Sequence, residues 1–453
     1  MSNIIIYILA CYVFFISLSS QANEKELKSD KKIYHSNDNI LLSYNKSKTG
    51  DTTWIGIWKF KSDSNTHLNP SDNNSWHQYS THRPYKLKYI IGKKGIYTLN
   101  ALTLGPGRYI AFLLKGKNDN QLSHPVIFDI ADKNNNIQLK ALTLNIWQEG
   151  TQVTGGYGGI VNTIINSNAD IISLSEVRNY HSDFTSQLSK SLNDKGYKYY
   201  TYRSGNDVGI LSKYPINQHS DINSFTKASI NISGENIEFY AGHLDYHNYA
   251  TYLPRGYDAN NWSELPNGPD TNLNDILNVN NNSGRPASIQ AFIPDAKNEL
   301  NNKKIVIMAG DFNEPSWLDW TEATKELFDH HGAIVPWTST KLLAEAGYLD
   351  TYRTKYPDPV KYPGFTWVAN NPDVAINKLT WAPKADERDR IDYIFYYPSP
   401  QLLVKDAFIV GPSSSIVKSQ RVKESSDDKF VTPKGVWPSD HKGVLITFNL
   451  KIK

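Results

Sequence analysis

The sequence predicts a small all-β sandwich followed by a larger α+β domain, and three observations support this prediction. Residues 32–131 contain short β-rich runs separated by Gly, Pro, Asn and Asp clusters. From residue 139 the pattern changes to strand, helix and strand with short connections. Several later apolar runs end in polar or ionisable residues. The 453 residues are too many for one ordinary core and sufficient for two domains, which we place at 23–136 and 137–453.

Residues 1–22 have the features of a signal peptide. Ile4 to Leu18 is apolar, the first charge is Glu24, and "SQA" at 20–22 is a small-residue cleavage site. Because a positive n-region is missing, an uncleaved membrane anchor is the alternative. The only cysteine, Cys11, lies in this segment, so the mature chain would contain no disulfide. The sequence therefore predicts export, to the periplasm or outside the cell.

The next segment predicts an Ig-like β-sandwich of roughly 100 residues. Its strand-like runs are "NILLSYN", "TWIGIWKF", "GIYTLNAL", "RYIAFLL" and "PVIFDI". Within them, "WIGIW" at 54–58 is interpreted as a core strand, with a ligand-stacking patch as the alternative. Residues 131–138 are the predicted linker.

Positive charge is concentrated in this first part. Residues 23–136 contain 17 Lys and Arg against 10 Asp and Glu, whereas residues 137–453 contain 31 against 35. A basic domain suggests a polyanion, an anionic surface or membrane headgroups as partner. A solvated basic face is the alternative, and the sequence leaves the oligomeric state open.

The larger part begins with a predicted βαβ unit. "LKALTLNIW" and "DIISLSEV" are strands, and the helix between them places Ile160, Ile164 and Ile165 on one face. A right-handed crossover makes the two strands parallel, so that their carboxyl ends meet at one edge. Asn145 and Glu176 stand at those ends, and together they resemble half of a metal site.

Six further strands are predicted: "DVGILSKYPI", "NIEFYAGHLDYH", "KKIVIMAGDFNEP", "GFTW", "DRIDYIFYY" and "KGVLITFNL". In the third of these, Gly310 is expected to let the chain turn. Asp311 and Asn313 are then expected on the same side, because extended chains have a two-residue period.

Oxygen ligands dominate the polar strand ends. Asn145, Glu176, Asp311 and Asn313 supply carboxylate and amide oxygens, the ligands that a hard cation prefers. We therefore expect Mg²⁺, with Mn²⁺ or Ca²⁺ as alternatives.

Two histidines add proton chemistry to this set. His243 in "AGHLDYH" and His441 in "WPSDHKG" can move protons near neutral pH. Asp392 lies in the apolar run "RIDYIF", where burial is costly unless an imidazolium pairs with it. Such a set suits attack of water on a phosphoester. The chain contains no Walker sequence and no HExxH. It also lacks a Gly-x-Ser-x-Gly elbow, and this absence disfavours acyl-ester hydrolysis.

The order of these motifs is similar to that of a known family. "LTLNIW", "SLSEV", "GILSKYPI", "GHLDY", "MAGDFN", "RIDYIF" and "PSDHKGV" resemble the endonuclease/exonuclease/phosphatase superfamily over about 139–450. That superfamily includes DNase I-like nucleases, apurinic endonucleases, neutral sphingomyelinases and inositol-polyphosphate 5-phosphatases. The resemblance implies a four-layer α/β/β/α sandwich with the site at one edge.

The resemblance also implies a role for each residue of the set. Glu176 would be the principal metal ligand, Asn145 its neighbour at the metal or phosphate, and Asp440 a further ligand. The remaining residues would act on the phosphate, the water or the leaving group: His243 would contact the scissile phosphate or protonate the leaving group, Asp311 would orient or activate the water, Asn313 would hold the phosphate, and Asp392 would orient His441. The general base stays open.

Other residues near these motifs receive separate interpretations. Asp350 in "GYLDTYR" is expected to be structural. Asp245 and His247 are expected in an exposed turn, with a site role as an equal alternative. The remaining positions lie before a strand or a helix: Arg203 and Asp207 are interpreted as solvated loop residues, with a substrate contact as the alternative, and a phosphate contact is considered for Arg285.

Substrate identity is less determined than the chemistry. Residues 246–284 are rich in Tyr, Trp and Asn and are expected to form a rim on which a sugar, inositol or base could stack. The first hypothesis is an exported Mg²⁺-dependent hydrolase of a phosphodiester, a phosphorylated small molecule or a lipid headgroup. The alternatives are a secreted DNase I-like nuclease and a catalytically silent binding protein. A nuclease would favour a basic groove, and residues 137–453 are net acidic.

Overall fold

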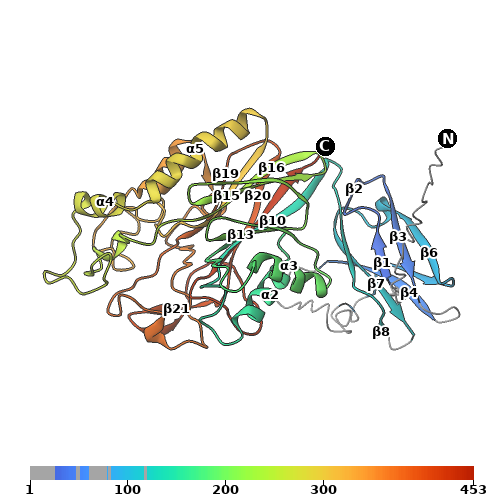
Figure 1. Cartoon of the computed structure of the whole chain (residues 1–453), viewed down its shortest axis with the longest axis horizontal. Coiled ribbons are helices and arrows are strands. Elements are labelled where there is room, and N and C mark those ends of the chain that lie inside the picture. The colour runs from blue at the N-terminus through green and yellow to red at the C-terminus, as the bar shows by residue number, and fades with distance from the viewer. Residues whose placement is uncertain (1–25, 47–51, 61–78, 80–82, 117–119) are drawn as a thin grey trace, which may run out of the picture.

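The structure is a computed structural model that describes the chain except for residues 1–25, 47–51, 61–78, 80–82 and 117–119. The predicted signal peptide, 1–22, lies outside the described residues. Among those that are described, no helix is long and apolar enough to span a bilayer. An N-terminal β-sandwich lies beside a larger α+β part (Figure 1).

The N-terminal part consists of two facing sheets, as predicted. One sheet has the order β1 (Glu26–Ser29), β3 (Asn39–Asn45), β6 (Lys94–Asn100). The other has the order β2 (Ile33–Tyr34), β9 (Val126–Ile130), β7 (Gly107–Lys115), β4 (Thr53–Lys59), β5 (Lys86–Ile90), and β8 (Asn120–Gln121) pairs with β7. The one-turn helix η1 (Ala101–Thr103) follows β6. Ile40, Ile55 and Phe128 are among the buried side chains between the sheets.

The "WIGIW" segment is a core strand rather than a ligand patch. It forms β4, and Trp54 and Trp58 are buried. Trp58 packs edge-on against Phe112 of the neighbouring strand β7. Both faces of β4 are therefore covered, which explains its nearly continuous apolar sequence.

The predicted βαβ unit is present. Strands β10 (Asn136–Asn145) and β11 (Ile171–Ser175) are parallel, and helix α2 (Gly156–Ser167) connects them. Ile160, Ile164 and Ile165 are buried, as their spacing predicts. Because β10 begins at Asn136, the connection from the sandwich is shorter than the predicted linker 131–138.

Two mixed sheets form the centre of the larger part. The first has the order β12 (Tyr200–Arg203), β13 (Val208–Ser212), β11, β10, β24 (Gly443–Lys451), β20 (Leu402–Val410), β23 (Phe430–Val431). The second has the order β14 (Ile216–Ile222), β15 (Phe225–Ile232), β16 (Glu235–His243), β17 (Ile305–Asp311), β19 (Asp392–Tyr396), β18 (Leu349–Asp350). Their inner faces share one apolar core that includes Ala141, Phe239 and Ile307.

Helices cover the outer faces of both sheets. On the first sheet, α2 and α3 (Phe184–Asp194) pack over strands β10 and β11. On the second, α5 (Arg285–Asn301) and α6 (Thr338–Glu345) pack over β16 and β17. The remaining short elements are η2 (Ala250–Tyr252), α4 (Leu273–Asn281), α7 (Thr351–Lys355), η3 (Ile376–Lys378), β21 (Ser414–Val417) and β22 (Gln420–Lys423). This is the predicted four-layer arrangement, although the expected "GFTW" strand is reduced to one bridge between Trp367 and Asp389.

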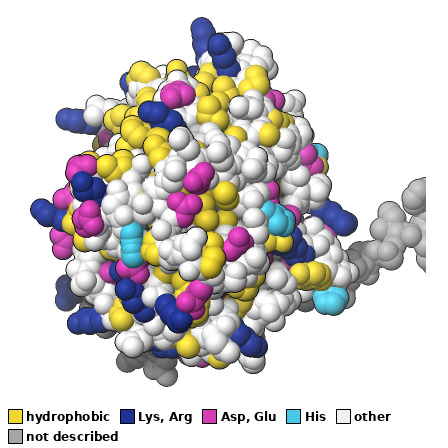
Figure 2. All heavy atoms as spheres, turned by 90° about the vertical axis from the view of Figure 1, so that its left-hand side faces the viewer, with side chains coloured by type: hydrophobic (Ala, Val, Ile, Leu, Met, Phe, Trp, Pro, Cys, Tyr) yellow, Lys and Arg dark blue, Asp and Glu magenta, His cyan; other side chains and the backbone are white. Residues whose placement is uncertain are grey.

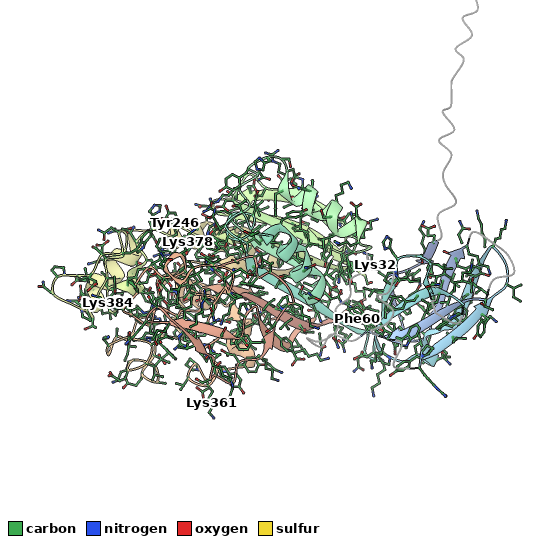
Figure 3. The ribbon with its side chains drawn as sticks, turned by 90° about the horizontal axis from the view of Figure 1, so that it is seen from below. Lys32, Phe60, Tyr246, Lys361, Lys378 and Lys384 are labelled. Carbon is green, nitrogen blue, oxygen red and sulfur yellow. The ribbon has the colours of Figure 1, made fainter. Side chains whose placement is uncertain are left out.

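The two parts meet along β7, β9 and the start of β10. Arg108 on β7 donates from Nη2 to Asp129 of the sandwich at 2.9 Å and to Asp170 of the larger part at 3.1 Å. Lys32 donates to the Lys213 carbonyl across the same junction. Figure 3 shows Lys32 and Phe60 at this junction.

Candidate active site

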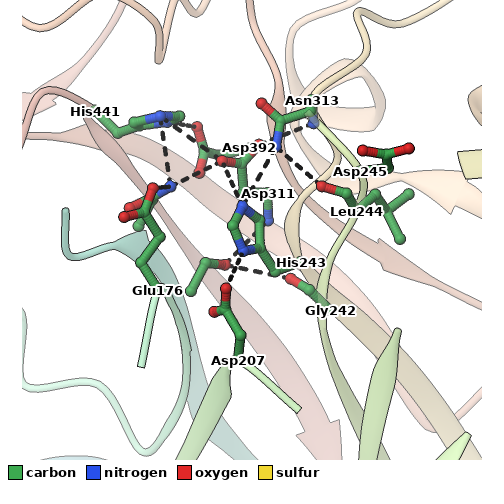
Figure 4. A network of polar contacts seen from close by, with 12 residues as sticks. Glu176, Asp207, Gly242, His243, Leu244, Asp245, Asp311, Asn313, Asp392 and His441 are labelled. Atoms are coloured by element: carbon green, nitrogen blue, oxygen red, sulfur yellow. Dashed lines mark hydrogen bonds and ion pairs between the residues drawn. The ribbon is translucent and has the colours of Figure 1, made fainter. Parts of the chain in front are cut away.

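The predicted site residues converge at one edge of the two packed sheets (Figure 4). Asn145 ends β10, and Glu176 follows β11 directly. In the second sheet, His243 at the end of β16 is paired with Asp311 at the end of β17, and Asp311 with Asp392. Strand register therefore brings these side chains together from segments far apart in the sequence.

Asp311 and Asn313 are placed by a turn rather than by the period of an extended chain. The backbone N–H of Asn313 donates to Asp311 Oδ1 at 2.9 Å, and Asn313 adopts a left-handed φ of 46°. The expectation that Gly310 lets the chain turn is also wrong, because Gly310 lies inside β17. A side chain there would collide with the Gly242 carbonyl on β16, so glycine allows the two strands to approach.

His441 forms a buried pair with Asp392, as predicted. His441 Nδ1 lies 3.0 Å from Asp392 Oδ2, and His441 Nε2 lies 3.7 Å from Asp311 Oδ2. Asp392 is the first residue of β19. Burial opposes the charge of His441, but the carboxylates of Asp392, Asp311 and Asp440 raise its pKa to about 10. The imidazole is therefore held protonated in this arrangement.

His243 has its own carboxylate partner, which sequence reasoning missed. His243 Nδ1 lies 3.1 Å from Asp207 Oδ2, so the interpretation of Asp207 as a solvated loop residue is wrong. Burial opposes the charge of His243, but the hydrogen bond with Asp207 and the charge of Asp311 outweigh it and raise the pKa of His243. The Asn313 amide nitrogen lies 3.3 Å from His243 Nε2. The sequence carried no clear signal for this role, because Asp207 reaches the site only through the pairing of β13 with β11, the strand that leads to Glu176.

Arg178 is a second residue that the sequence did not point to. Its guanidinium forms an ion pair with Asp207 and lies 3.8 Å from Glu176 Oε2. Among the described residues that line the pocket, it is the only Arg or Lys.

A left-handed loop holds Glu176 and Asn145. Four consecutive residues, Trp147 to Gly150, have positive φ angles between 41° and 72°. The N–H of Gln148 donates to Glu176 Oε2, and the N–H of Trp147 donates to Asn145 Oδ1, both at 2.9 Å. Such backbone strain commonly accompanies functional sites, where surrounding contacts maintain it.

The set of oxygen donors fits a divalent cation. Glu176 and Asp440 line the pocket, and Asp311 is close by. Burial raises the pKa of Asp440 to about 7. The charge of His441 opposes this rise, and the charge of Glu176 adds to it. Carboxylates that repel one another in a buried site are relieved by a cation.

Asn145 joins these carboxylates to one another. Its Nδ2 donates to Glu176 Oε1 at 3.1 Å and to Asp311 Oδ2 at 2.9 Å. Asp311, Asp392 and His441 also offer ligand atoms within 4.8 Å of one another, but Asp392 and His441 are already hydrogen-bonded to each other. We therefore regard Glu176 and Asp440 as the candidate cation ligands and the buried trio as proton chemistry.

Aromatic side chains wall the pocket, whose volume is about 310 Å³. Tyr246, Tyr249, Tyr252 and Trp262 come from the predicted rim 246–284, and the other aromatic residues are Trp147, Trp367 and Trp381. The face of the molecule that is turned away from the sandwich carries Asp and Glu side chains among hydrophobic ones (Figure 2).

Buried hydrogen bonds fix part of this wall. The Tyr249 hydroxyl donates to Asp389 and the Tyr252 hydroxyl to Glu387, both at 2.9 Å. These two rings are therefore a preformed part of the pocket.

Four other residues named from the sequence do not line the pocket. Arg285 is fully buried and donates to the backbone carbonyls of residues 245, 247 and 248, so it holds the rim segment and does not contact phosphate. Asp350 caps α7, as its structural interpretation predicts. His247 forms a pair with Asp245 at 2.7 Å, with 58% of its side chain exposed.

Comparisons with known proteins found a matching family profile and a similar protein. A sequence profile described as the endonuclease/exonuclease/phosphatase family matches residues 142–441. An uncharacterized protein of Caenorhabditis elegans is 30% identical over 320 residues, which are 68% of this chain and 91% of that protein.

Solved structures with lower similarity were also found. An endonuclease/exonuclease/phosphatase family protein from Leptotrichia buccalis is 18% identical, with a TM-score of 0.40, over 68% of this chain and 99% of the other. A truncated TDP2 from Caenorhabditis elegans is 17% identical, with a TM-score of 0.39, over 69% and 98%. A 3′ phosphatase, NExo, from Neisseria, bound to a product DNA hairpin, is 16% identical, with a TM-score of 0.40, over 68% and 98%.

Proposed function

Because the chain belongs to the endonuclease/exonuclease/phosphatase family of divalent-metal-dependent phosphoester hydrolases, we propose that it is an exported Mg²⁺-dependent enzyme in which water attacks the phosphorus of a substrate held in the aromatic pocket. The substrate is a phosphodiester, a phosphorylated small molecule or a lipid headgroup. The observation that carries this proposal is the pair of histidine–carboxylate couples, His441–Asp392 and His243–Asp207, on either side of Asp311.

Mg²⁺ would be held by Glu176 and Asp440, with Asn145 beside it. When bound, it supplies positive charge to the phosphate oxygens and to the departing oxyanion. The donor set supports this choice, because carboxylate and amide oxygens suit a hard cation and the pocket lining among the described residues contains no thiolate or unpaired imidazole.

Side chains of the protein supply the remaining catalytic roles. Asp311 accepts from Asn145 and from the Asn313 backbone, which holds its carboxylate in place to orient the attacking water and to accept the proton that this water loses. His441, kept protonated by the neighbouring carboxylates although burial opposes its charge, donates to a non-bridging phosphate oxygen. His243 has a raised pKa and gives its proton to the leaving oxygen, and Asn313 holds the phosphate.

The pocket walls favour a substrate that carries a ring next to the phosphate. Trp262 and Trp381 lie with ring centroids 4.4 Å apart, and a sugar, inositol or base could pack against this pair. We expect Trp262→Ala to raise KM several-fold for a ring-bearing phosphodiester while kcat stays within twofold, because only ground-state packing is removed. A small dialkyl phosphodiester should show no such change in KM.

A nuclease is the second candidate, because the same aromatic pair could stack the bases of a single strand. A plasmid-nicking and single-strand cleavage assay, run beside a panel of phospholipids and inositol phosphates, separates the two candidates. We expect turnover on the small-molecule panel and little nicking. Rapid nicking with no turnover on the panel would establish the nuclease instead.

Chelation tests the enzyme proposal itself. EDTA should abolish turnover and Mg²⁺ should restore it. A chain that binds phosphoesters without any turnover in Mg²⁺, Mn²⁺ or Ca²⁺ would be the silent binding protein.

Export rests on the apolar run Ile4–Leu18 and the "SQA" segment that follows it. Amino-terminal sequencing of the mature protein should begin near Asn23. A mature chain that retains Met1 and partitions with membranes would support the uncleaved anchor.

A further inference from the structure

The N-terminal sandwich exposes large apolar side chains where β5 leads into β6. Tyr89, Ile91 and Ile96 are 63%, 86% and 63% exposed. Leu87 and Leu102, close by in the sequence, are also exposed. Isolated exposed apolar residues are common, but a group of this size within one segment marks an interaction surface.

These side chains lie around the connection between β5 and β6. Strand β5 is the edge of one sheet and β6 the edge of the other, so residues 91–93 connect two open edges. A hollow there is lined by Tyr44, Tyr89, Ile91, Ile96 and Tyr97. We call Arg83 to Leu104, which contains both strands and this hollow, the sandwich tip.

The charged residues around this apolar group are all positively charged. The sandwich tip contains Arg83, Lys86, Lys88, Lys93 and Lys94 and no Asp or Glu. Among the described residues, none of these five cations forms an ion pair. Aliphatic and aromatic residues flanked by free lysines are the composition of segments that lie at a membrane interface.

We propose that the sandwich tip docks on an anionic phospholipid bilayer, with Ile91 and its apolar neighbours entering the acyl region and the lysines contacting lipid phosphates. A polyanion such as nucleic acid would use the lysines but would leave Ile91 and Ile96 in water. A bilayer can bind both the lysines and the apolar side chains, because its charged headgroup layer lies directly over an apolar interior.

Docking through the tip turns the catalytic pocket away from the membrane. The sandwich connects to the start of β10, and the pocket lies at the end of that strand, about 30 Å further on for ten residues. Tyr246 of the pocket rim lies on the side of the larger part remote from the sandwich (Figure 3). The docked protein would therefore take its substrate from the solution, not from the bilayer that holds it.

A polarity-sensitive fluorophore at position 91 tests this inference in the full chain. Cys11→Ser removes the only thiol, and Ile91→Cys then carries the label. We expect a blue shift in emission with vesicles of phosphatidylglycerol and phosphatidylcholine, and none with phosphatidylcholine alone. The shift should weaken as salt is added.

Two controls keep the result specific to the tip. Leu403, 60% exposed on β20, is labelled as Leu403→Cys and should show no shift, even if the apolar N-terminus binds the vesicle. The double change Lys93→Glu and Lys94→Glu should weaken vesicle binding of the tip on the order of tenfold or more. Hydrolysis of a soluble phosphodiester should remain unchanged in both.

Three results would overturn the proposal. The first is an unshifted spectrum at position 91 with anionic vesicles. The second is an equal shift at position 403. The third is a self-associated chain that Ile91→Glu converts to monomers, since a second copy would then cover the tip.

Discussion

At the scale of single residues, the site is built from imidazoles that are each held by a carboxylate. Asp392 orients His441 and Asp207 orients His243, while Asp311 lies 3.7 Å and 3.8 Å from the respective Nε2 atoms. A buried imidazole with a fixed partner has one tautomer and one orientation, which a proton donor requires.

We predict that His441→Ala lowers kcat by about 10²- to 10⁴-fold, the contribution typical of a positioned proton-transfer group. Cation affinity, measured by calorimetry with Mg²⁺, should change little, because Glu176 remains. His247→Ala is the matched control: it removes another histidine paired with an aspartate, but an exposed one, and should leave kcat unchanged. A His441→Ala variant within tenfold of the parent would contradict the assignment.

We predict that Asp207→Asn lowers kcat about tenfold or more and moves the alkaline limb of its pH profile to lower pH. The direction follows because Asp207 raises the pKa of His243, so that its loss makes the protonated imidazole deprotonate earlier. Stopped assays over pH 5–9 measure this shift. If Asp207 were only a structural support, kcat would fall without any movement of the limb, and Asp207→Glu would restore nothing.

At the scale of elements, irregular segments rather than strands form the pocket walls. Residues 147–150 and 246–262 contain no strand and only the one-turn helix η2, and buried polar contacts hold them in place. Residues 320–337 pack against this region: His330 stacks on Trp320 with ring centroids 3.6 Å apart, and Arg255 lies over the same indole.

We predict that His330 makes the fold sensitive to acid. Burial and the nearby charge of Arg255 lower the pKa of His330 to about 2, whereas in the unfolded chain it is about 6.5. Only the unfolded state gains a proton as the pH falls below 6.5, so the free energy of unfolding decreases there by about 1.4 kcal/mol per pH unit.

Urea denaturation between pH 7 and 5 measures this dependence. His330→Phe keeps an aromatic ring on Trp320. Whatever the stability of this variant at pH 7, its free energy of unfolding should depend less on pH, because the contribution of His330 is missing. Parallel slopes for the parent and the variant would show that His330 titrates normally in the folded protein.

At the scale of the whole molecule, buried charges connect the sandwich to the catalytic part. Asp170 accepts from Arg108 of the sandwich and from Lys213 of the first sheet, each at 3.1 Å. Burial opposes the charge of Asp170, but these two cations outweigh it and lower its pKa to about 2. Its stabilising contribution is therefore complete at neutral pH and is lost only as the pH falls from about 3.9 towards 2.

We predict that Asp170→Asn lowers the free energy of unfolding at pH 7 by about 3–5 kcal/mol, because it leaves buried cations without their partner. Asp194→Asn, which removes a highly exposed ion pair with Lys190, should change it by less than about 1 kcal/mol. Denaturant titrations of the three proteins make the comparison. Equal stability of the parent and Asp170→Asn would show that the junction does not depend on this charge.

The β-rich first part, the βαβ unit and most strands of the larger part could be predicted from the sequence, and so could the closeness of most candidate site residues. Asn145, Glu176, His243, Asp311, Asp392 and His441 all follow or begin apolar runs, and a buried polar residue at such a position is visible without coordinates. Asp207 and Arg178 could not be found in this way. They lie in loop sequence of ordinary composition, and only the pairing of β13 with β11 brings them to His243 and Glu176.

By itself, therefore, the sequence determined the chemistry: a carboxylate-rich, histidine-containing edge in a fold of the endonuclease/exonuclease/phosphatase family. The tertiary structure decided which groups meet. It assigned Asp207 to His243, buried Arg285 beneath the rim, placed Asn313 by a turn at Asp311, and arranged aromatic rings around the pocket. The physical reason is that apolar periodicity records which residues are buried along one segment, whereas a hydrogen-bond partner depends on the register between segments that the chain brings together only on folding.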